Sequence, residues 1–123
     1  MKYSCTRQQE NGAWYYGEDP KYHWIDNFHT GYNLDAIALY TKSTRDQSDA
    51  ENLQRGLCFY LEHFFDGNGR PRYYHDRTFP VDSQCISQSV DTLTLLADKD
   101  PRALPMARKV AAWAIRNMQG RDG

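Results

Sequence analysis

Two stretches of sequence decide the fold: residues 24–40 read WIDNFHTGYNLDAIALY, and residues 79–96 read FPVDSQCISQSVDTLTLL. When Asp26 is superposed on Asp82, a second aspartate, Asp35, falls on Asp91, and the apolar positions between and after them also coincide. A cap, an apolar stripe and a second acid that recur together favour an internal repeat over chance agreement. The matching apolar positions are Leu34 with Val90, Ile37 with Leu93, and Leu39 with Leu95.

Glycine-containing turns recur at the same interval as the two stretches. They read ENGAWYY at 10–16, GNGRPRYY at 67–74 and QGRDG at 119–123, and the first two lead into aromatic residues. The interval suits one helical hairpin plus a long connection. Residues 3–9 resemble the last turns of a helix, and the third turn stops before its aromatics. The sequence therefore predicts that residues 1–123 are a single fragment of about two hairpins from a longer array.

Hydrophobic periodicity predicts four helices and no regular strands. Asp26 and Asp82 stand where the side chain of an N-cap would accept a backbone N–H bond. Ser48 and Glu51 have the spacing of a capping box, and Asp100 is placed to cap the last helix. The predicted helices span 26–41, 49–65, 82–98 and 101–118, and the aromatic stretches 13–16 and 72–75 are expected to be extended or irregular.

The apolar stripes of these helices predict the core and also an association. We expect the end faces of the two hairpins to expose apolar surface, which predicts a homo-oligomer, most simply a two-fold dimer. The residues expected in the core are Leu34, Ile37, Leu57, Leu61, Val90, Leu93 and Ala114.

Composition excludes several classes of function. The 15 Lys and Arg against 16 Asp and Glu give a net charge of −1, so we expect no nucleic-acid partner. No apolar run is long enough to span a bilayer, and no signal peptide follows Met1, so we expect no membrane partner and a cytoplasmic location. The three cysteines show no CxxC spacing, which argues against a disulfide framework and a zinc site.

Aromatic residues make up 14% of the chain, with nine Tyr and three Trp. Many of them form lead-ins to the predicted helices: Trp14–Tyr16 and His23–Trp24 precede the first, and Tyr73–His75 precede the third. Aromatic rings stack on flat ligands such as sugars, but they also provide large buried area. The lead-ins could therefore bind a saccharide or simply pack over the helix ends.

The segments at 24–40 and 70–97 resemble the inner helices of (α/α) toroids and their aromatic lead-ins, a group that includes six-hairpin glycosidases, polysaccharide lyases and terpenoid cyclases. The resemblance implies an all-α fold of antiparallel αα-hairpin repeats, a fragment of an (α/α)6 toroid. The chain also resembles bacterial toroid proteins associated with polysaccharide metabolism. The QW repeat of the cyclases is absent. Four helices without alternating strands do not fit the (β/α) barrel that delta-aminolevulinic acid dehydratase resembles.

In glycosidases of this architecture, acids and aromatics near the inner-helix ends often form the sugar site. The resemblance therefore implies catalytic roles for Asp26, His29 and Asp82, since glycoside hydrolysis uses two carboxyl groups about 5–10 Å apart. Both aspartates could instead be only helix caps, and His29 could be a structural partner of Asp26. The residues expected to bind the substrate are Trp24, Tyr32, His23 and Tyr74.

These observations predict a carbohydrate-active protein, glycoside-hydrolase-like, that acts on or binds a saccharide. The alternative is a non-catalytic helical scaffold that binds sugar or protein. The spacing of His23, Asp26 and His29 matches no strong metal-binding motif, so we expect no metal and no cofactor.

Overall fold

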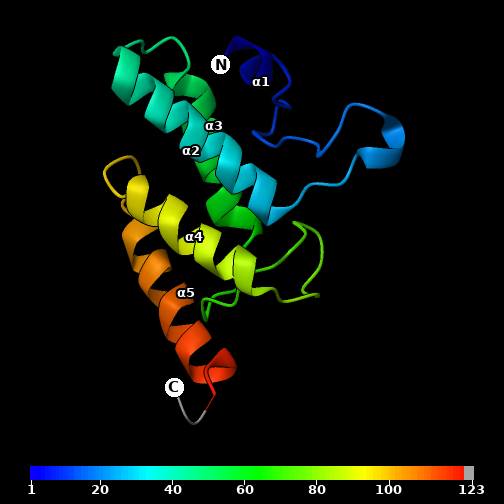
Figure 1. Ribbon diagram of the computed structural model, residues 1–123, viewed down its shortest axis with the longest axis vertical. Helices are drawn as coiled ribbons and strands as arrows, with labels where there is room; N and C mark the ends of the chain where they lie inside the picture. The colour runs from blue at the N-terminus through cyan, green and yellow to red at the C-terminus, as the bar shows by residue number, and fades with distance from the viewer. Residues whose placement is uncertain (121–123) are drawn as a thin grey trace.

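The computed structural model describes residues 1–120 as helices joined by irregular loops (Figure 1). The all-α prediction is confirmed, because β-pairing among these residues is limited to isolated bridges and forms no strand. Each predicted helix is present within three residues of its expected ends, whereas residues 121–123 of the predicted third turn lie outside the described part. In chain order the elements are α1 (Lys2–Thr6), the 3-10 turn η1 (Pro20–Tyr22), α2 (Asn27–Thr44), α3 (Ala50–His63), α4 (Ser83–Leu95) and α5 (Ala103–Met118).

The helices form two consecutive hairpins, α2–α3 and α4–α5. Helices α2 and α4 lie side by side and run in the same direction (Figure 1), and they share one of the closest helix contacts in the molecule. The connection between α1 and α2 loops out to one side of the helices (Figure 1). This arrangement supports the helical-repeat character of the chain.

Helices α2 and α4 begin in the predicted way. The Asp26 carboxylate accepts a hydrogen bond from the backbone N–H of His29 at 2.8 Å, and the Asp82 carboxylate accepts one from Gln84 at 2.6 Å. Both aspartates have extended backbone, as an N-cap requires. The repeated aspartates are therefore caps, whatever further role they have.

The predicted caps of the other two helices are wrong. Helix α3 has Asp49 as its N-cap, with no side-chain cap bond, because Ser48 belongs to a preceding turn in which its N–H donates to Asp46. Helix α5 begins at Ala103, since Asp100 first closes a turn of its own by accepting from the backbone N–H of Arg102. In both places a local turn precedes the helix, so the helix begins at a later residue than predicted.

The core lies between the two hairpins and under the first aromatic lead-in. Trp14 is 5% exposed and packs on Gly56, where an added Cβ would lie 2.6 Å from the indole ring. Val90 and Ala114 are only half-buried, so their prediction as core is wrong. They border a groove between α4 and α5 that no described residue covers. The other predicted core residues are buried: Leu34, Ile37, Leu57, Leu61 and Leu93.

Candidate functional site

The two aromatic lead-ins are joined by backbone hydrogen bonds. The N–H of Asn27 donates to the carbonyl of Tyr73 at 2.8 Å, and the N–H of His75 donates to the carbonyl of Ile25 at 3.3 Å. Asp26 and Tyr74 form an isolated antiparallel bridge between these bonds. Segments about fifty residues apart in the sequence are thereby held together at the start of α2.

This pairing creates a hollow of about 220 Å³ between the lead-ins. Three of the four residues expected to bind a substrate, His23, Trp24 and Tyr74, line it. A liquid water occupies about 30 Å³, so the hollow has room for one small ring rather than an oligosaccharide. The remaining lining residues are Pro20, Lys21, Ile25, His75, Asp76 and Arg77.

Sequence reasoning missed the polar side of this hollow. The Arg77 guanidinium lies 4.8 Å from the centre of the Tyr74 ring and forms an ion pair with Asp76 at 3.0 Å. The hydrogen bond from Arg77 lowers the pKa of Asp76. The run of His75, Asp76 and Arg77 directly after two tyrosines was the available signal in the sequence. Together these groups offer forked donors and carboxylate acceptors beside an aromatic ring.

The first lead-in folds back on itself as an aromatic arm, residues 14–24. The N–H of Tyr16 donates to the carbonyl of Trp24 at 2.8 Å, and the rings of these residues stack with centres 4.6 Å apart. Tyr15 stacks on His23 at 4.2 Å. Tyr15 and Tyr16, one from each stack, both line a hollow next to α1.

A second hollow, of about 340 Å³, lies against the arm next to α1. Tyr15 and His23 form part of its wall, and an ion pair between Arg7 and Glu18, 2.8 Å long, crosses its rim. His23 thus borders both hollows, whereas Trp24 and Tyr74 border only the one between the lead-ins. The arm is the partition between the two spaces.

Two of the three predicted catalytic residues, Asp26 and His29, lie beside the arm, whereas Asp82 lies at the start of α4. His29 Nδ1 lies 2.9 Å and 3.0 Å from the two carboxylate oxygens of Asp26, which is only 2% exposed. His29 is half-buried, with its ring 4.7 Å from that of Tyr16. None of the hollows described here is lined by Asp26, His29 or Asp82. Their predicted catalytic roles stay predictions.

The charges of Asp26 and Asp82 raise the pKa values of the same two neighbouring groups, Tyr73 and Cys85. Burial raises the pKa of Tyr73, and the nearby charges of Asp26 and Asp82 raise it further. Burial likewise raises the pKa of the Cys85 thiol to about 12, with added contributions from the same two carboxylates. Tyr73 and Cys85 therefore lie between the starts of α2 and α4.

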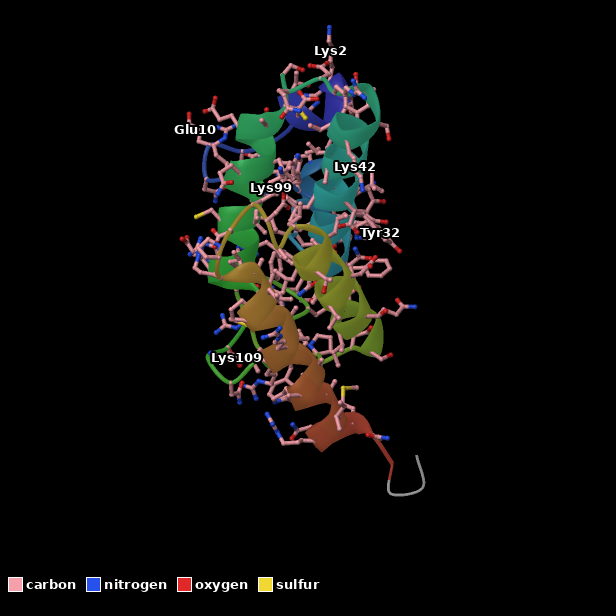
Figure 2. All side chains as sticks on the ribbon, turned by 90° about the vertical axis from the view of Figure 1, so that its left-hand side faces the viewer. Lys2, Glu10, Tyr32, Lys42, Lys99 and Lys109 are labelled. Atoms are coloured by element: carbon pink, nitrogen blue, oxygen red, sulfur yellow. The ribbon has the colours of Figure 1, made fainter. Side chains whose placement is uncertain are left out.

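Tyr32, the fourth residue expected to bind a substrate, does not line the hollow between the lead-ins. It is 48% exposed on the outer face of α2, with its ring 4.5 Å from that of Phe28 and 6.3 Å from that of His29. Figure 2 shows it projecting from the helix surface. The structure therefore brings together three of the predicted binding residues and leaves the fourth on an open helix face.

Comparison with protein-family models, curated proteins and solved structures found no match for the chain. Among residues 1–120, no three His, Cys, Asp or Glu side chains are grouped so that they could hold a metal ion. Within the same residues, no helix combines the length and apolar character needed to cross a membrane. The site is therefore interpreted from its own geometry.

Proposed function

We propose that the chain is part of a helical-hairpin repeat fold of the (α/α) toroid type and that it binds one saccharide ring in the hollow between its lead-ins. The observation that carries this proposal is the pairing of the two lead-ins, which brings Trp24 and Tyr74 into the same small hollow. Each lead-in alone would present its aromatic ring to solvent. Held together, they form a concave site, the usual shape of a small-molecule site.

The chemistry of the walls suits a sugar. A sugar ring has apolar C–H faces, which pack on aromatic rings, and a rim of hydroxyl groups, which need both donors and acceptors. Arg77, which lies over the Tyr74 ring, supplies planar donors, and Asp76 beside it supplies acceptors. A purely apolar ligand would use neither of these groups, which pair with each other.

Binding is better supported than hydrolysis. Glycoside hydrolysis needs a carboxylic acid and a second carboxyl group facing the bond that is cleaved. Asp26 is enclosed, and both of its oxygens already lie within hydrogen-bond distance of His29. A carboxylate held in this way positions its histidine and the start of α2 rather than reaching a ligand.

The alternative, a helical scaffold that binds protein, predicts a different surface. A scaffold would use exposed helix faces rather than the hollow between the lead-ins. The two functions can therefore be distinguished by whether an added saccharide perturbs the residues of the hollow.

The test is an NMR titration of the chain with glucose, N-acetylglucosamine and glucuronate, followed through the backbone amides and the indole N–H groups. A single-ring ligand that binds with a Kd of about 1 mM gains about 4.1 kcal/mol, so millimolar sugar should shift the signals. We expect shifts at Trp24, Tyr74 and Arg77. Glucuronate would be favoured over the neutral sugars if Arg77 contacts the ligand through its charge.

Matched tryptophan variants provide the control. Trp24→Ala removes one wall of the hollow and should weaken binding by about two- to tenfold, the range expected for about 0.5–1.5 kcal/mol of aromatic contact. Trp113→Ala, on α5 and away from the hollow, should leave binding unchanged. The proposal is wrong if none of the three sugars shifts the Trp24 signal, or if Trp113→Ala weakens binding as much as Trp24→Ala does.

A further inference from the structure

The contact between α2 and α4 is a specific helix-to-helix fit. Gln88 on α4 donates to the Asp35 carboxylate on α2 at 2.6 Å. Gly31 on α2 lets α4 approach closely, because an added Cβ would lie 2.7 Å from Gln88 Cγ and 3.1 Å from Thr92 Oγ1.

The sequence repeat places a similar face on the outer side of α4. In the register that superposes Asp26 on Asp82, the residues of α2 that receive α4 correspond to residues that are exposed on α4. Gly31 corresponds to Ser87, and Asp35 corresponds to Asp91. The small hydroxyl residue and the carboxylate both border the groove of about 660 Å³ between α4 and α5.

The groove beside this face is apolar and open. Val90 and Ala114 are half-buried within it, and Ile115 is 62% exposed at its edge. In the first repeat, Leu34, which corresponds to Val90, has no exposed surface. The surface around Val90 on the second hairpin is therefore open, whereas the equivalent surface around Leu34 on the first hairpin is buried.

The same register places the complementary face on α2. Gln88 corresponds to Tyr32, and Thr92 corresponds to Ala36; both Tyr32 and Ala36 are exposed. The Tyr32 hydroxyl can donate to a carboxylate, as the Gln88 amide does. Tyr32 and Ala36 lie one turn apart on α2, so a helix docked along this face would meet both side chains.

We propose that the outer face of α4 binds the outer face of α2 of a second copy of this chain, head to tail. In this pairing Tyr32 of one copy donates to Asp91 of the other, and Ala36 packs against Ser87. Ser87 is larger than Gly31, so the helices stand further apart, and Tyr32, longer than Gln88, spans the added distance.

A head-to-tail contact has a clear signature, because each copy keeps one face free. Chains or rings should grow with concentration, whereas a two-fold contact would stop at a dimer. Sedimentation velocity over a concentration series measures this directly. A wild-type chain that remains a monomer, or stops at a dimer, at the highest concentration would overturn the proposal.

Two arginine variants separate the faces. Ala36→Arg blocks only the α2 face, and Ser87→Arg blocks only the α4 face; both positions are exposed, so circular dichroism should show unchanged helix content. Each block should raise the dissociation constant by about tenfold or more, since the larger side chain overpacks the contact and holds the two helices apart. Gln54→Arg, at an exposed position on α3, is the control and should assemble like the wild type.

The decisive measurement is an equimolar mixture of the two blocked variants. Each alone should be a monomer, and together they should form a one-to-one dimer, because each retains the face that the other lacks. Failure of the mixture to associate would overturn the proposal. So would normal assembly of either variant alone, which would indicate a symmetric contact through a single helix face.

Discussion

The Gly31→Ala substitution is the sharpest test of the fit between α2 and α4. The added methyl group would lie 2.7 Å from Gln88 Cγ, a distance at which the side chain must move. If Gln88 stays in place, the overpacking costs about 1–3 kcal/mol. If it moves away, its hydrogen bond to the Asp35 carboxylate is lost, at about 1.5–3 kcal/mol. Alanine regains about 1 kcal/mol of helix propensity.

These terms predict a net loss of up to about 2 kcal/mol in the free energy of unfolding, measured by urea denaturation followed by circular dichroism. The Gln88→Ala background removes the clashing group, so Gly31→Ala should there be neutral or stabilising, a coupling of at least about 1 kcal/mol. Gly67→Ala is the control, because no atom lies within 4 Å of its added Cβ. Equal effects of Gly31→Ala in the two backgrounds would refute the reasoning.

Two further predictions concern single ionisable groups. Burial raises the pKa of Asp35, so its ionisation opposes folding, and stability should fall as pH rises from about 3.8 through the raised value. Asp35→Asn should remove this fall in unfolding free energy measured against pH; an unchanged slope would show that Asp35 is not its source. Cys58 is part-exposed beside Arg102, whereas Cys85 is 1% exposed with a pKa raised to about 12. A disulfide reagent at pH 8 should therefore modify Cys58 at least about tenfold faster than Cys85, and Cys58→Ser should remove the fast phase, unless Cys85 is the more reactive thiol.

The helices were predictable because their signals are local. Asp26 and Asp82 cap α2 and α4 through bonds to backbone groups two or three residues away, so the sequence alone carries the information. The same kind of local signal gave wrong N-caps at Ser48 and Asp100, because a turn of the chain precedes the helix at both places. Capping patterns identify a helix start but do not exclude a competing turn.

Part of the candidate site was also predictable. His23, Trp24 and Tyr74 could be selected because aromatic residues precede helices at the repeat interval, and the structure brings all three to one hollow. Arg77, which completes that hollow, has local partners in Asp76 and Tyr74, but they do not indicate that the segment faces Trp24. Its position depends on the hydrogen bonds between the two lead-ins, which join residues about fifty positions apart.

The sequence by itself determined the helices, the caps of α2 and α4, and most of the core, since periodicity and capping act within one or two turns of chain. Only the tertiary structure decided that α4 packs closely against Gly31 and that the Tyr32 side chain is exposed. It also decided that Val90 borders an open groove, whereas Leu34 is fully buried. These outcomes depend on which surfaces meet, and the packing of distant segments sets that, because equivalent residues of a repeat have the same pattern whether or not a neighbour covers them.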